Sequence, residues 1–140
     1  MKNIEKKKIK NIIKAIDPTI EICFGSRCLE CNPVENIIYI PNRYYNKDTK
    51  IFREWYKKHF NEKLTKRETK LISILHEVGH ILTYDEDISK ERELNCSLLK
   101  LMFEYGGLTT KELNTLYFEN ECELNATEWA RGYMKELVKN

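Results

Sequence analysis

The stretch Leu71-Ile-Ser-Ile-Leu-His-Glu-Val-Gly-His-Ile-Leu82 carries the pattern from which the rest of the chain is best understood. Within it, His76, Glu77 and His80 form an H-E-x-x-H motif. Residues four apart lie on one face of a helix, so both imidazoles can bind a single zinc ion at about 2.0–2.1 Å. Glu77 lies one position further around the helix, where its carboxylate can act as a base toward a zinc-bound water. The motif therefore predicts a zinc site with Glu77 as general base.

The residues around the motif predict an amphipathic helix. Its apolar stripe consists of Leu71, Ile74, Leu75, Val78 and Leu82. Thr65-Lys-Arg-Glu68 is a capping box that starts the helix well before the motif. The histidines are expected on the opposite side, toward a cleft, together with Thr69, Ser73 and Thr83. Two surface histidines by chance are the alternative, but the chain has only 3 histidines and two are in register around Glu77.

Composition and pattern predict one α+β domain over residues 1–140. The chain has 140 residues, of which 41% are hydrophobic, and this suffices for a single core. Its 24 basic and 22 acidic residues nearly balance, so no direct nucleic-acid binding is expected. The odd count of 5 cysteines, with neither a signal-peptide pattern nor an apolar run of ~18 residues, favours a reduced, cytoplasmic protein without membrane contact.

The N-terminal part predicts a helix followed by two short strands. Isoleucines recur at helical spacing within residues 1–17, before a proline ends the helix. Residues 19–24 and 36–41 have strand-like patterns, and the loop between them indicates an antiparallel hairpin. Pro41 cannot donate a ladder hydrogen bond, so it suits the end of an edge strand. An extended peptide can add to such an edge.

Three cysteines lie in this hairpin region, namely Cys23, Cys28 and Cys31. The spacing Cys28-Leu-Glu-Cys31 is that of a zinc knuckle or a redox pair. A structural zinc needs four ligands, and no second pair remains elsewhere in the chain to complete it. Ordinary loop thiols are therefore the preferred interpretation.

Helices are expected through the rest of the chain. Residues 44–50 are polar and irregular, and residues 51–60 predict a short helix with an aromatic core face. After the motif helix, Asp87 is the expected N-cap of a helical hairpin over residues 88–118. Gly106-Gly107 separates its two arms.

The last helix, from about residue 120, is expected to supply a third metal ligand, because catalytic zinc sites have three protein ligands. Its candidates are Glu119, Glu121, Glu123 and Glu128. Helical spacing places Glu123 on the apolar, inward stripe and places Glu121 and Glu128 on the opposite side. An ionised glutamate on an apolar face requires a partner, such as a cation. Glu119 is the fallback ligand, and an exposed glutamate at the helix start is the alternative interpretation of Glu123.

Two motifs together resemble the ImmA/IrrE-type metallopeptidase family. The first is His76-Glu-Val-Gly-His80, and the second is Glu123-Leu-Asn-Ala-Thr-Glu-Trp-Ala130 on a later helix. The strand before the motif helix is also similar. The resemblance implies a compact minimal zincin fold, mostly helical, with a small antiparallel hairpin packed beside the H-E-x-x-H helix. It further implies Zn²⁺ bound by His76, His80 and Glu123, with Glu77 as general base.

The same resemblance implies a bacterial or phage-encoded regulatory protease whose protein substrate is a helix-turn-helix repressor. Thr127 stands where the family usually has Asp or Asn, at a position that suits a partner for a ligating histidine. Asn125 replaces the second Glu of the family pattern and is expected to face away from the site. Tyr84, Tyr133 and Arg131 are candidates by residue type for stabilising the oxyanion of the transition state.

The sequence therefore favours a zinc-dependent endopeptidase over a second class of function. The alternative is a non-catalytic, zinc-containing regulatory protein that binds a partner along the hairpin edge. Intact Glu77 favours catalysis, since retention of zinc does not require it.

Overall fold

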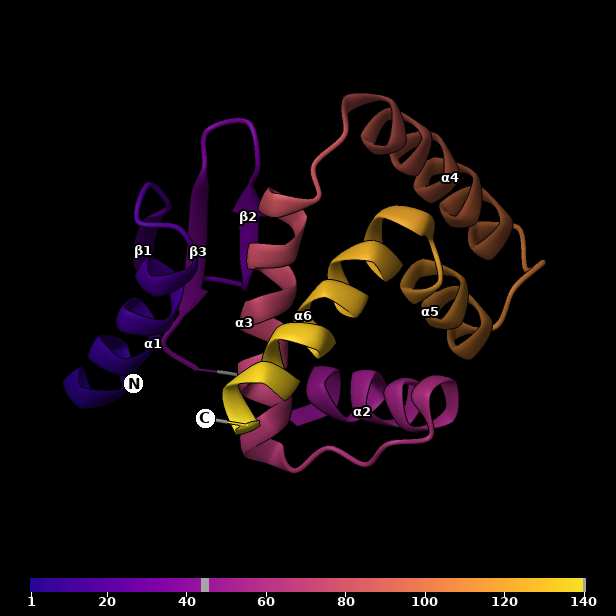
Figure 1. Ribbon diagram of the computed structural model, residues 1–140. Helices are drawn as coiled ribbons and strands as arrows, with labels where there is room; N and C mark the ends of the chain where they lie inside the picture. Colours follow the sequence, from indigo (N-terminus) through magenta and orange to yellow (C-terminus); the bar gives the residue numbers. More distant parts are fainter. Residues whose placement is uncertain (44–45, 140) are drawn as a thin grey trace.

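The computed structural model describes residues 1–43 and 46–139. Within them the chain forms six helices and three strands, so the predicted α+β class is confirmed, with helix predominating (Figure 1). The elements are α1 (Asn3–Ile16), β1 (Glu21–Ser26), β2 (Glu30–Asn32), β3 (Ile37–Pro41), α2 (Asn46–Phe60), α3 (Lys66–Leu82), α4 (Glu86–Glu104), α5 (Thr110–Phe118) and α6 (Glu121–Lys139). None of these helices is long and apolar enough to cross a membrane.

The sheet differs from the predicted hairpin. Its strand order is β1-β3-β2, with β1 parallel to β3 and β2 antiparallel to β3. The hairpin therefore joins β2 to β3, and the predicted pairing of residues 19–24 with 36–41 was wrong in direction. Strand β2 has only three residues, too few to show a period-two pattern in the sequence. Asn36, whose φ is 61°, makes the left-handed turn into β3.

The position of Pro41 also differs from the prediction. It ends β3, which is the central strand, so the expectation of an edge strand there was wrong. Proline is tolerated because it is the last residue of the strand, opposite Ser26, where the register with β1 shifts after Phe24. Gly25, with a φ of 87°, supplies the backbone conformation at this irregularity. The edge beside α3 instead belongs to β2 (Figure 1).

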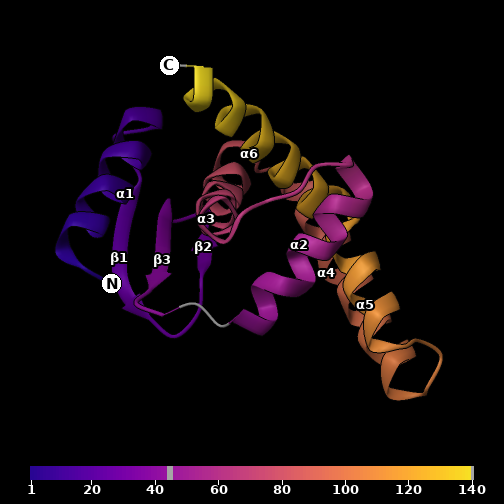
Figure 2. The same ribbon diagram turned by 90° about the horizontal axis from the view of Figure 1, so that it is seen from below.

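Helix α3 lies between two hydrophobic cores. Ile74 and Val78 pack with isoleucines of α1 and the sheet, whereas Ile72 and Leu75 pack with residues of α2 and α6. Seen along its axis in Figure 2, α3 has the sheet on one side and α2 and α6 on the other. Because α3 is buried on both sides, it fixes the position of the sheet relative to α2 and α6.

The buried surface of α3 is wider than the single predicted stripe. Ile72 and Thr69 are both fully buried, although Thr69 was expected on the cleft side, while Leu82 is 42% exposed. The Thr69 hydroxyl donates to the carbonyl of Thr65 at 2.7 Å, so its burial leaves no unpaired polar group. The predicted capping box is confirmed, since Thr65 and Glu68 bond each other's backbone N–H.

Helices α3 and α6 cross in close contact at Gly79. A Cβ atom at this position would lie 2.6 Å from the carbonyl oxygen of Ala126. Only glycine permits this approach, because backbone atoms on both sides cannot move aside. The crossing brings His76 and His80 of α3 within hydrogen-bond distance of Glu123 of α6, and it depends on the small residues Gly79 and Ala126.

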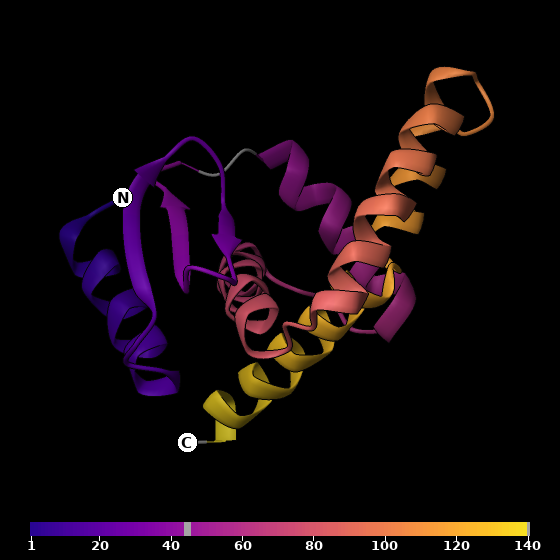
Figure 3. The same ribbon diagram turned by 90° about the horizontal axis from the view of Figure 1, so that it is seen from above.

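Helices α4 and α5 form the predicted helical hairpin, which projects away from the two cores (Figure 3). Its N-cap is Asp85, not Asp87 as predicted, because the Asp85 side chain accepts from two N–H groups of the first turn. Gly106, with a φ of 76°, ends α4 as expected. Helix α2 begins at Asn46, five residues before the predicted start, while the expected irregular structure of residues 44–45 lies outside the described residues.

Candidate metal centre

Helices α3 and α6 bring the three predicted ligands together. Atom Oε2 of Glu123 lies 2.8 Å from Nε2 of His76 and 2.9 Å from Nε2 of His80. The three potential ligand atoms all lie within 4.8 Å of one another. Two imidazole nitrogens and one carboxylate oxygen are a donor set for a transition-metal ion that leaves a coordination position open. The residues present therefore fit a metal ion.

Glu123 is the buried charge of this group, with 2% of its surface exposed. Burial alone would raise its pKa, but hydrogen bonds from His76 and His80 outweigh burial and hold the pKa of Glu123 well below its usual range. The glutamate is thus an anion at neutral pH in an otherwise apolar helix interface. This is the arrangement expected from its position on the inward stripe of α6.

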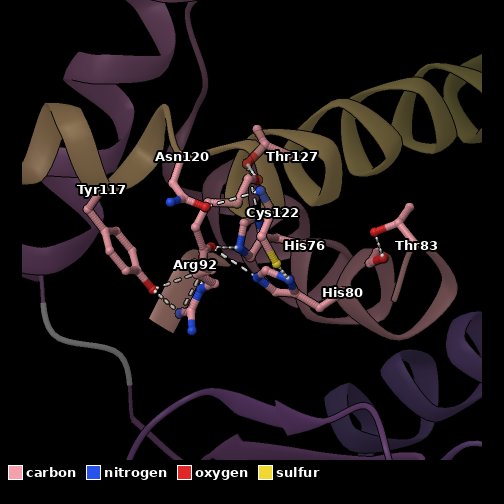
Figure 4. Close-up of polar contacts among 10 residues, drawn as sticks. His76, His80, Thr83, Arg92, Tyr117, Asn120, Cys122 and Thr127 are labelled. Atoms are coloured by element: carbon pink, nitrogen blue, oxygen red, sulfur yellow. Dashed lines mark hydrogen bonds and ion pairs between the residues drawn. The ribbon is translucent and has the colours of Figure 1, made fainter. Parts of the chain in front are cut away.

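Thr127 completes the surroundings of His76. Atom Nδ1 of His76 lies 2.9 Å from the Thr127 hydroxyl oxygen, and that hydroxyl donates to the carbonyl of Glu123 at 3.0 Å (Figure 4). Because its hydrogen is used by the carbonyl, Thr127 accepts from Nδ1–H. With Nδ1 held by Thr127, Nε2 of His76 faces the site and is the atom that would bind a metal ion.

Sequence reasoning missed Arg92 and Tyr117, which bind the other oxygen of Glu123. Arg92 Nε donates to Oε1 at 2.9 Å, and the Tyr117 hydroxyl donates to the same oxygen at 3.1 Å (Figure 4). Arg92 also donates to the Tyr117 oxygen at 3.1 Å. These residues come from α4 and α5, so the helical hairpin contributes directly to the site. Their sequence neighbours show no motif, and only the packing of the hairpin reveals them.

Glu77 points into the cleft from α3 and lies beside β2. Its carboxylate lies near the thiol of Cys31, and Glu77 lines both cavities next to the metal-ligand group. Burial raises the pKa of Glu77 above its usual value, although the neighbouring His76 and His80 oppose the rise. A carboxylate with a raised pKa is better matched to accepting a proton near neutral pH.

His80 has a second contact with Cys122, whose sulfur lies 3.7 Å from Nδ1. Burial lowers the pKa of His80, but hydrogen bonds with Cys122 and Glu123 outweigh burial and raise that pKa to about 10. A sulfur atom is a weak hydrogen-bond partner, so His80 is oriented less firmly than His76.

The remaining candidates lie away from the ligand group or at its margin. Glu119 faces Trp55 Nε1 at 3.4 Å, and Glu121 and Glu128 are exposed. Among the oxyanion candidates, Arg131 binds Glu62 and Tyr133 stacks on Trp129, whereas Tyr84 lines one cavity. Cys31 lies in β2 and Cys28 just before it, and neither joins a metal-ligand cluster among the described residues.

Two cavities meet at this group. One, of about 670 Å³, contains His76, and the other, of about 720 Å³, contains His80. Leu29, Glu77, Tyr117 and Glu123 line both cavities. The two cavities together are called the cleft; Glu77 lines both of them, and β2 lines the one that contains His80. An extended chain in this cleft would place one of its carbonyl groups at the ligand group.

Comparison with protein-family models, with curated proteins and with solved structures gives no match to this chain.

Proposed function

We propose that the chain is a zinc-dependent endopeptidase with a compact zincin-type domain, similar to the ImmA/IrrE-type metallopeptidases. The observation that carries the proposal is Oε2 of Glu123 within 2.9 Å of both motif histidines, with Glu77 in the same cleft. Zinc bound there would act as a Lewis acid toward a peptide carbonyl and would make a water acidic enough to lose a proton near neutral pH.

In this proposal Glu77 performs the proton transfers. Its carboxylate takes the proton from the attacking water and returns it to the leaving amine when the peptide bond breaks. Burial raises the pKa of Glu77, and the raised pKa favours holding the proton between these two events. Glu123, held on both sides by hydrogen bonds, keeps the histidines in place without taking part in the proton transfers.

The substrate would be an extended protein segment beside β2. Among the described strands β2 pairs only with β3, so its other edge has no strand partner, and residues 29–34 line one of the cavities. Main-chain hydrogen bonds to β2 would align a peptide with the cleft. The resemblance to regulatory proteases suggests a repressor of the helix-turn-helix type as partner. The protein would then act in the bacterial cytoplasm and be encoded by a bacterium, a phage or another mobile element.

The decisive variant is Glu77→Gln, which keeps the size of the side chain and leaves the three ligands intact. Wild-type protein loaded with zinc should cleave members of a proteome-derived peptide mixture, detected by mass spectrometry. Glu77→Gln should retain zinc and lose activity by about 10²–10⁴-fold. Glu121→Gln, an exposed change on α6, is the matched control and should cleave normally.

Two results would count against an enzyme. Full cleavage by zinc-loaded Glu77→Gln would remove Glu77 from the chemistry. Failure of the wild type to cleave any peptide or helix-turn-helix protein, with peptide binding preserved, would support the non-catalytic regulator that binds along β2.

A further inference from the structure

The exposed charged residues that are peculiar to each half of the cleft differ in sign. The half that contains His76 is lined by Arg27 and Arg43, both exposed, and within the described residues neither has a carboxylate partner. The half that contains His80 is lined by the exposed residues Glu30 and Glu93. Glu77 and Glu123 line both halves, so they do not distinguish them.

The third arginine in the described lining of the cleft does not cancel this difference. Arg92 lines the half with the two glutamates, but its guanidinium is bound to Glu123 at 2.8 Å. Its charge is therefore paired with the carboxylate of Glu123. A substrate side chain that enters this half meets Glu30 and Glu93, and one that enters the other half meets Arg27 and Arg43.

The direction of β2 relates the two halves to the direction of a bound peptide. Residues 27–29, just before β2, line the arginine half, and residues 30–34 line the glutamate half. The strand therefore runs from the arginine half to the glutamate half. Antiparallel pairing is the more stable mode, and a peptide added in that way runs in the opposite direction. Its residues after the ligand group then lie in the arginine half.

We propose that the cleft selects protein segments with an acidic side chain on the C-terminal side of the scissile bond and a basic side chain on the N-terminal side. This inference rests on the proposed endopeptidase function and names its substrate class. Arg27 and Arg43 are the specificity-determining residues for the acidic side chain. The charges are exposed to solvent, so each contact should change the preference modestly, by about 2- to 5-fold, and less at high salt.

The test compares cleavage products of one peptide mixture for three proteins. Wild-type protein should give products enriched in Asp or Glu after the cut and in Lys or Arg before it. The double variant Arg27→Glu/Arg43→Glu should lose or invert the first enrichment. The control Lys57→Glu/Lys58→Glu makes the same charge change on exposed positions of α2 outside both cavities and should behave as wild type.

A binding measurement separates this inference from the proposed function. Two synthetic peptides are compared, one with acidic residues in its C-terminal half and one with lysines at the same positions. Zinc-loaded Glu77→Gln should bind the acidic peptide about 3- to 10-fold more tightly. Equal binding, or enrichment of acidic residues before the cut, would overturn the charge selection while leaving the protease intact. Absence of Glu77-dependent cleavage with the charge preference retained would overturn only the protease.

Discussion

At the scale of single residues, the two oxygens of Glu123 have different partners. Oε2 faces the two histidines, and Oε1 is held by Arg92 and Tyr117. This division leaves Oε2 as the atom available to a metal. It also explains how an anion can be buried at the crossing of two helices, since its full hydrogen-bonding capacity is used.

Glu123 is therefore expected to bind metal more strongly than any neighbouring glutamate. Glu123→Gln keeps the volume but removes the charge and should weaken zinc binding sharply, as measured by competition with a chelating dye. Glu119→Gln is the control and should bind zinc normally, because the Glu119 side chain contacts Trp55 and His59 and neither of the motif histidines. A greater loss in Glu119→Gln would show that the ligand lies one turn earlier.

Arg92 is expected to act as a positioning residue for this ligand. Arg92→Leu removes the guanidinium from Oε1, so Glu123 can rotate and zinc affinity should fall by about 10- to 100-fold. Arg92→Lys restores the charge without the fork of donors and should recover part of the affinity. Lys90→Leu, an exposed change on the same helix, should have no effect. Unchanged zinc affinity in Arg92→Leu would limit Arg92 to holding the helical hairpin.

At the scale of elements, the site depends on how closely α3 and α6 approach. Gly79→Ala places a methyl group against the Ala126 carbonyl and should lower the free energy of unfolding by about 1–3 kcal/mol, despite the better helix propensity of alanine. Gly132→Ala in α6 has no atom within 4 Å of the new Cβ and should raise stability by about 0.5–1 kcal/mol. Denaturant titration measures both. If Gly79→Ala and Gly132→Ala changed the free energy of unfolding equally, α3 and α6 could move apart at Gly79 without cost.

At the scale of the whole molecule, metal binding should raise the stability of the folded protein. The ligands lie on α3 and α6, and α3 packs on both cores, so a bound ion stabilises only the folded arrangement. With zinc at about 1,000 times its dissociation constant, the gain is about 4 kcal/mol. The melting temperature should therefore rise on zinc addition for the wild type and for the surface variant His59→Ala. It should not rise for His80→Ala, and a similar rise there would place the zinc elsewhere.

The amino-acid sequence determined those features that depend on neighbours along the chain. His76 and His80 are four residues apart, so they lie on the same face of α3. The capping box determines where that helix begins. The same reasoning placed Glu123 on the inward face of α6, because a charge on an apolar stripe requires a partner. These are properties of helices of 17 and 19 residues, which are long enough for side-chain periodicity to be a reliable guide.

Tertiary structure alone decided the features that depend on distant segments. Strand β1 is parallel to β3 because the chain passes through β2 before it enters β3. Strand β2 is too short to show a pattern in the sequence. Arg92 and Tyr117 reach Glu123 because the α4–α5 hairpin packs on α6, and nothing in their own segments marks them. Contacts of this kind depend on packing and buried charge over the whole chain, whereas the spacing of His76 and His80 is already contained in one helix.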